Sequence, residues 1–193
     1  MYKRQMILQR ITCFLLLAAA ALVFIYSLGI MTDLYDSLAE VSSAEEFEFK
    51  YVEGSKIYQD MQPFNKDLTT AGIILILSAV GLFLFRTHNR RKYYVANYIS
   101  IGINTVLNVG VSIWALTNVF QYKAQYLLVD FEKLREVCEF YPIKYTDSTF
   151  WFDISLAVFI PLLLFTLVNI GSMIWKIMLM KAEKKLIEEG KEG

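Results

Sequence analysis

Residues 68–92 read LTTAGIILILSAVGLFLFRTHNRRK, and this stretch decides the fold because its character changes abruptly within it. Its first part, residues 68–85, is uncharged and long enough for a helix to cross most of the roughly 30 Å of hydrocarbon in a bilayer. Its second part is basic, and the cations there are Arg86, Arg90, Arg91 and Lys92. Basic residues in short loops stay on the cytoplasmic side of a membrane. The stretch therefore predicts a transmembrane helix followed by a cytoplasmic hinge over residues 86–93.

Three more apolar runs flank this stretch, at residues 11–31, 94–120 and 151–175. Each is long enough to cross a bilayer. Trp151 and Trp175 stand at the two ends of the last run, where aromatic anchors are expected. The chain as a whole is 56% hydrophobic, which is more than a typical soluble domain contains. We therefore predict an all-α membrane protein built as a four-helix transmembrane bundle.

The first apolar run has two interpretations. It follows the basic residues Lys3, Arg4 and Arg10, which is also the pattern of a secretory signal peptide with residues 18–21 as the cleavage region. Strongly apolar residues continue through residues 22–25, beyond that region. This continuation favours an uncleaved membrane anchor.

The orientation follows from the distribution of Lys and Arg. These residues gather in the N-terminal arm (residues 1–10), the hinge (residues 86–93) and the tail (residues 176–193). The long segment over residues 32–67 is acid-rich, and the segment over residues 121–150 is mixed in charge. We expect a multi-pass protein of the plasma membrane, with both termini in the cytoplasm and both long segments outside.

The two long segments contain periodic patterns that predict a small extracytoplasmic cap. Apolar residues recur at helical spacing beyond the first and third spans. Beyond the first span they are Ile30, Leu34, Leu38 and Val41, and beyond the third they are Leu127, Phe131, Leu134 and Cys138. Pro142 is expected to end the second helix. Alternating residues over 46–52 and 143–146 predict two short strands. We expect the helix extensions to pack against each other.

Asparagines mark the third span. Asn97, Asn104 and Asn108 lie at spacings of seven and four, which places them in one stripe on a helix. An amide facing lipid is costly, so the stripe should face the bundle interior, a cavity or another subunit. With Asn169 of the fourth span, the stripe is either a polar path for a solute or a seam of helix packing. The spacing does not separate these two interpretations.

The basic hinge also has two interpretations. Arg86, Arg90, Arg91 and Lys92 are suited to contact anionic lipid head groups. The same residues are fully explained as determinants of topology.

Several function classes find little support in the sequence. No ionisable residue lies deep in a predicted span, and His88 is the only histidine, so we predict no catalytic residue, no metal site and no cofactor. A net charge of zero gives no reason to expect a nucleic-acid partner. Cys13 is expected inside the membrane and Cys138 outside, so they cannot pair within one molecule. Cys138 is either free or bridges two copies.

These exclusions leave two hypotheses of function. The first is a non-enzymatic accessory or protein-interaction subunit of a membrane complex, whose partners are the lipid bilayer and another membrane protein or a second copy of itself. The second is an oligomeric pore or carrier for a small solute, lined by the asparagine stripe of the third span.

Overall fold

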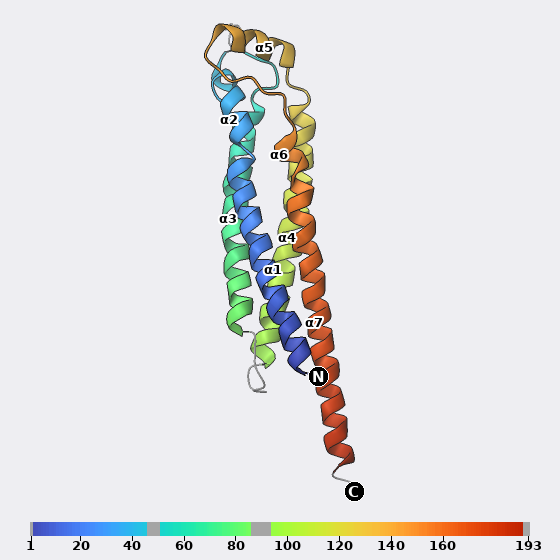
Figure 1. Cartoon of the computed structure of the whole chain (residues 1–193). Helices are drawn as coiled ribbons and strands as arrows, with labels where there is room; N and C mark the ends of the chain where they lie inside the picture. The colour runs from blue at the N-terminus through green and yellow to red at the C-terminus, as the bar shows by residue number, and fades with distance from the viewer. Residues whose placement is uncertain (1, 46–50, 86–93, 191–193) are drawn as a thin grey trace.

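Four long helices lie side by side in the computed structural model, which describes residues 2–45, 51–85 and 94–190 (Figure 1). They are α1 (Tyr2–Gly29), α3 (Ile57–Phe85), α4 (Tyr94–Tyr126) and α7 (Ser155–Glu189). Each contains a segment long and apolar enough to cross a membrane. These are the helices of a multi-pass membrane protein.

Shorter elements gather at one end of the bundle (Figure 1). They are α2 (Thr32–Leu38), the 3-10 turn η1 (Val41–Ser43), α5 (Phe131–Phe140) and α6 (Phe150–Asp153). We call this end the head, and it comprises the described residues 30–45, 51–57 and 127–154. The start of α1 and the end of α7 lie at the opposite end, and α7 continues past the other helices (Figure 1).

The long helices pack as a ring, in which α1 and α4 each contact both α3 and α7. Leu16, Leu68 and Leu162 are fully buried between them. On the outside, large apolar side chains such as Leu77 and Val106 are exposed. An apolar outer surface is what a bundle in hydrocarbon requires, because lipid covers it.

One glycine sets the distance between α1 and α3. A Cβ added at Gly72 would lie 2.9 Å from the Cα of Phe24. The two backbones can approach this closely only because the position lacks a side chain, as is common at helix contacts in membranes.

Two expectations for the head are wrong among the described residues. The strand expected over residues 143–146 does not form, and residues 143–149 have no regular secondary structure. Ile143 and Tyr145 pack against the core as single side chains, and Lys144 pairs with Asp36, so this segment is held by side-chain contacts. Of the other expected strand, residues 46–50 lie outside the described residues, and residues 51–52 are not in a strand.

The prediction that Leu127 lies on the apolar face of the second helix extension is also wrong. Leu127 precedes α5 and is 58% exposed. Asp130 caps α5 by accepting a hydrogen bond from the Lys133 backbone N–H at 2.9 Å. Because this cap starts a new helix, the buried face of α5 does not continue the pattern of α4. Leu134 and Val137 form that face. The helix ends at Phe140, shortly before Pro142.

Candidate functional site

The four asparagines singled out by the sequence are all buried inside the bundle. Asn97 and Asn169 have no exposed surface, and Asn104 and Asn108 are 1% exposed. On α4 the stripe therefore faces the bundle interior, which is one of the three placements that the sequence left open.

Asn108 and Asn104 connect α4 to two neighbouring helices. The Asn108 amide donates to the hydroxyl of Thr166 on α7 at 2.8 Å and to the Asn104 carbonyl oxygen at 3.0 Å. The Asn104 amide in turn donates to the hydroxyl of Ser78 on α3 at 2.9 Å. One chain of hydrogen bonds thus spans α3, α4 and α7 at the level of these residues.

Helix α1 contributes two glutamines that the sequence reasoning missed. The Gln9 amide donates to the Asn97 carbonyl oxygen at 2.9 Å, and the Gln5 amide donates to the hydroxyl of Ser172 on α7 at 3.1 Å. Both glutamines lie in the segment expected to be a cytoplasmic arm, yet α1 begins at Tyr2 and buries them. Their spacing of four residues on one helix face was the signal that could have found them.

We call the whole set the polar seam. It consists of Gln5, Gln9, Ser78, Asn97, Asn104, Asn108, Ser112, Thr166, Asn169 and Ser172. Every one of the four long helices contributes to it. At its end, four residues beyond Ser172 on α7, Lys176 is also buried, with 2% of its surface exposed.

Some hydrogen-bonding capacity in the polar seam is unused. Neither the oxygen nor the nitrogen of the Asn169 amide has a partner among the described residues, and the same holds for the Asn97 nitrogen and the Asn108 oxygen. A buried polar atom without a partner costs about 1–3 kcal/mol. The seam therefore joins helices and leaves polar capacity unused at Asn169.

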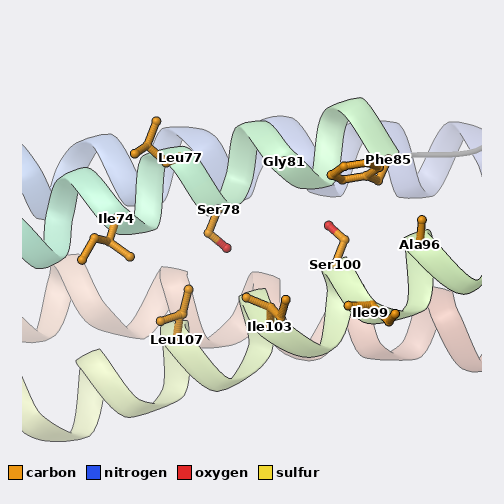
Figure 2. A pocket seen from close by; sticks show the side chains of 10 residues that line it. All are labelled: Ile74, Leu77, Ser78, Gly81, Phe85, Ala96, Ile99, Ser100, Ile103 and Leu107. Atoms are coloured by element: carbon orange, nitrogen blue, oxygen red, sulfur yellow. The ribbon is translucent and has the colours of Figure 1, made fainter.

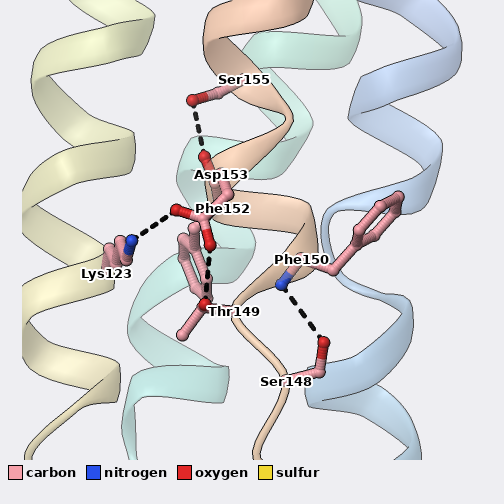
Figure 3. Close-up of polar contacts among 7 residues, drawn as sticks. All are labelled: Lys123, Ser148, Thr149, Phe150, Phe152, Asp153 and Ser155. Atoms are coloured by element: carbon pink, nitrogen blue, oxygen red, sulfur yellow. Dashed lines mark hydrogen bonds and ion pairs between the residues drawn. The ribbon is translucent and has the colours of Figure 1, made fainter.

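A second polar cluster fastens α6 and the start of α7 to α4 where the head meets the bundle (Figure 3). Lys123 on α4 forms an ion pair with Asp153, and the Thr149 hydroxyl donates to the same carboxylate at 2.7 Å. The Ser148 hydroxyl accepts from the Phe150 backbone N–H at 3.2 Å, and Ser155 donates to the Phe152 carbonyl at 2.6 Å. These bonds fix the chain where it enters the last long helix.

The remaining predicted sites are placed as follows. Arg86, Arg90, Arg91 and Lys92 lie outside the described residues. Within residues 2–45, 51–85 and 94–190, His, Cys, Asp and Glu side chains form no group of three able to hold a metal ion. Cys13 is buried and Cys138 half-buried, and neither forms a disulfide.

The fold and the polar seam together define the class, a helical multi-pass membrane protein with an amide-lined interior. Comparison with protein-family models, with curated proteins and with solved structures gave no match. The function must accordingly be argued from the chain itself.

Proposed function

We propose that this protein is a non-enzymatic accessory subunit of a membrane complex and binds another membrane protein through its head. The observation that supports this proposal is the exposure of large apolar side chains there: Leu128 is 77% exposed and Phe140 is 75% exposed. Along the spans, lipid accounts for exposed apolar surface. In a head that stands outside the bilayer, such side chains indicate a contact surface for a partner.

The head is ordered by contacts between its two segments. The Asp130 N–H donates to the Glu53 carbonyl at 3.1 Å. Beside it, Gly54 adopts a positive φ of 78°, and a Cβ there would lie 3.0 Å from the Val129 Cα, so the turn fits tightly only as glycine. An ordered head supports the proposal because a preformed surface loses less entropy on binding.

One ion pair adds to this order. Lys144 lies 3.0 Å from Asp36, and this carboxylate raises the pKa of the Lys144 amine. The Lys144 amine is therefore protonated at neutral pH. Its contribution to stability is present below the ordinary pKa of lysine and is lost as the pH rises through the raised value.

The proposal includes an orientation. We place the chain in the plasma membrane with both termini in the cytoplasm. The head then lies outside, as an extracytoplasmic cap of helix extensions. The start of α1 and the end of α7 lie opposite the head (Figure 1). The support is the positive charge of these segments, in which Lys3, Arg4 and Lys181 are exposed.

A purification in mild detergent tests the proposal. Tagged protein is expected to retain a stoichiometric foreign membrane protein, identified by mass spectrometry. The double variant Leu128→Gln, Phe140→Gln should weaken binding of this partner by at least about thirtyfold, since buried apolar anchors contribute more than about 1 kcal/mol each. The matched control replaces two exposed apolar residues of the α7 tail, Leu186→Gln and Ile187→Gln. Recovery of this chain alone, or equal loss in both variants, would overturn the proposal.

The second candidate function is an oligomeric pore or carrier for a small solute. The unpartnered amide of Asn169, buried beside the asparagine stripe, is the observation that favours it. A path through the seam must admit water at Asn104 and Asn108. Cysteine at either position should then react with a small water-soluble thiol reagent in the intact membrane, whereas a packed seam protects both from reaction.

A further inference from the structure

A groove lies between α3 and α4 (Figure 2). Aliphatic side chains such as Ile74, Leu77 and Ile103 line it, and none of the described residues in its lining is charged. The hydroxyls of Ser78 and Ser100 point into the space between the helices (Figure 2). The hydrocarbon of any lipid can cover such walls, so this groove selects no particular ligand.

A pocket of different chemistry lies where the head meets the bundle. It is formed by the end of α1, the start of α2 and the first turns of α3, and its volume is about 460 Å³, within the range of ligand sites in proteins. Apolar Leu28 and Met31 line it together with polar side chains. The polar residues in its lining include Tyr35, Tyr58, Gln62, Asn65 and Lys66. We call it the junction pocket.

The junction pocket lies at the level where hydrocarbon gives way to water. Along the first span the apolar run ends at Met31, and along α3 the charged residues Lys66 and Asp67 immediately precede the uncharged run that begins at Leu68. On the membrane side of this boundary, Leu28 is 59% exposed. A ligand that is apolar at one end and polar at the other, as a membrane lipid is, matches this level.

One cation sets the charge of the junction pocket. Among the described residues that line it, Lys66 alone has a charged side chain, and its amine forms no ion pair within the described part of the chain. Asp67 is turned about 100° away from Lys66 around the helix and does not line the pocket. Because no carboxylate in the lining offsets the amine, the pocket favours an anionic group.

Asn65 restricts the ligand further. Its side-chain oxygen is buried and accepts no hydrogen bond from the described residues. A buried acceptor without a partner is costly, so a ligand that donates to it gains affinity. A phosphodiester has no proton to donate, and the donor must therefore be a hydroxyl or an ammonium elsewhere in the head group. Since an ammonium would add a second positive charge near Lys66, a hydroxyl fits better.

The rest of the lining extends away from the membrane and suits a polyol. Lys66 and Tyr58 are eight residues apart on α3, which is roughly 12 Å along the helix. The Tyr58 ring contacts that of Tyr35 on α2, with 6.3 Å between the ring centroids. The two phenol hydroxyls and the Gln62 amide supply both donors and acceptors for the hydroxyls of a head group.

We propose that the junction pocket binds the head group of an anionic phospholipid that carries free hydroxyls, such as phosphatidylglycerol. Lys66 binds the phosphate, the Asn65 oxygen accepts a hydrogen bond from a head-group hydroxyl, and Leu28 and Met31 contact the start of the acyl chains. The lipid comes from the leaflet on the side of the head. This inference is independent of the proposed binding of a protein by the head, because it involves neither Leu128 nor Phe140.

The first test uses the full chain in vesicles of equal parts phosphatidylglycerol, phosphatidylethanolamine and phosphatidylcholine, followed by mild extraction and native mass spectrometry. The wild type should retain one phosphatidylglycerol per chain in preference to the other two lipids. Lys66→Gln should retain about tenfold less of it, because a charge-assisted hydrogen bond is lost. Lys56→Gln is the matched control, since Lys56 is exposed and does not line the pocket. Equal retention of the three lipids by the wild type, or equal retention of phosphatidylglycerol by the two variants, would overturn the proposal.

Asn65→Leu tests the hydrogen bond separately from the charge. Leucine is similar in size and removes a buried oxygen that has no partner among the described residues, so the variant should fold. It should retain about fivefold less phosphatidylglycerol than the wild type. Unchanged retention would overturn the selection of a hydroxylated head group.

Competition by a water-soluble phosphate distinguishes a lipid from a free ligand. Glycerol phosphate in excess should not displace phosphatidylglycerol from the wild type, because it lacks the acyl chains that Leu28 and Met31 contact. Displacement would show that the junction pocket takes a soluble phosphate, and so would overturn the assignment to a lipid.

A further measurement on the wild type does not depend on the folding of any variant. Phosphatidylglycerol with a photoreactive group on its glycerol head should label peptides that contain Tyr35 and Tyr58. Label spread evenly over the four long helices would contradict a site in the junction pocket.

Discussion

Asn108 illustrates how a polar side chain is accommodated in an apolar bundle. Its amide donates two hydrogen bonds, to Thr166 and Asn104, and so joins α4 to α7 in the interior of the bundle. Hydrogen bonds of this kind between membrane helices contribute about 0.6 kcal/mol on average and up to about 1.7 kcal/mol. The seam therefore stabilises the bundle by the sum of several modest contributions.

Replacing Asn108 with leucine should lower the free energy of unfolding by about 1–2 kcal/mol, because the helix contact is lost and the Thr166 hydroxyl loses a donor. Unfolding of the purified protein by a denaturing detergent would measure this. Asn118→Leu is the control, since Asn118 is only half-buried and donates to the Trp114 carbonyl of its own helix. Equal losses in the two variants would argue against the seam as a source of stability.

Gly72 and Gly110 should respond in opposite directions to the same substitution. Gly72→Ala forces a Cβ against the Phe24 backbone and should destabilise the protein by about 1–3 kcal/mol. Gly110→Ala meets open space and should be neutral or stabilising by up to about 1 kcal/mol through its helix propensity. Thermal unfolding in detergent would check both. A stabilised Gly72→Ala protein would contradict the close approach of α1 and α3.

At the scale of single elements, α5 places Cys138 at the border of its buried face. The thiol is half-buried, and burial raises its pKa above the ordinary value. Because the thiolate is the reactive form, a raised pKa leaves less of it at any given pH.

At pH 7, a maleimide should accordingly alkylate Cys138 more slowly than an exposed cysteine one residue away. The pH at which the alkylation rate reaches half of its maximum should be higher for Cys138. The wild type is compared with the double variant Cys138→Ala, Glu139→Cys, because Glu139 is exposed. Rates measured across pH 6 to about 9.5 bracket the ordinary pKa of about 8.5. If the two proteins gave the same alkylation rate at every pH, the Cys138 thiol would not be shielded.

The end of α7 should contribute little to stability. Residues 181–188 are all exposed, and the helix continues there beyond its neighbours (Figure 1). Removing residues 181–193 should change the free energy of unfolding by no more than about 0.5 kcal/mol, as is usual for surface changes. A larger loss in thermal stability would mean that the tail packs on the protein or on a second copy.

At the scale of the whole molecule, the proposed orientation makes the head and the tail accessible from opposite sides. A membrane-impermeant maleimide should label Cys138 in intact cells. It should label Gly190→Cys, in a Cys138→Ala background, only after permeabilisation. Cys13 has no exposed surface and should remain unlabelled in both cases. The reverse pattern would place the head in the cytoplasm and remove the support for an external partner.

The sequence by itself determined the number of long helices and the single face that the asparagines of the third span share. Both are local properties: length and hydropathy define a helix able to span a bilayer, and spacings of seven and four define a face. The same reasoning was wrong at residues 143–146, because two or three alternating residues specify a strand only if a partner strand is present.

Only the tertiary structure decided the partners of each polar group. Gln5 and Ser172 are 167 positions apart in the chain, and the ring arrangement of the helices brings them together. Contacts between distant segments depend on the path of the whole chain, whereas hydropathy and helical period are determined within a few turns.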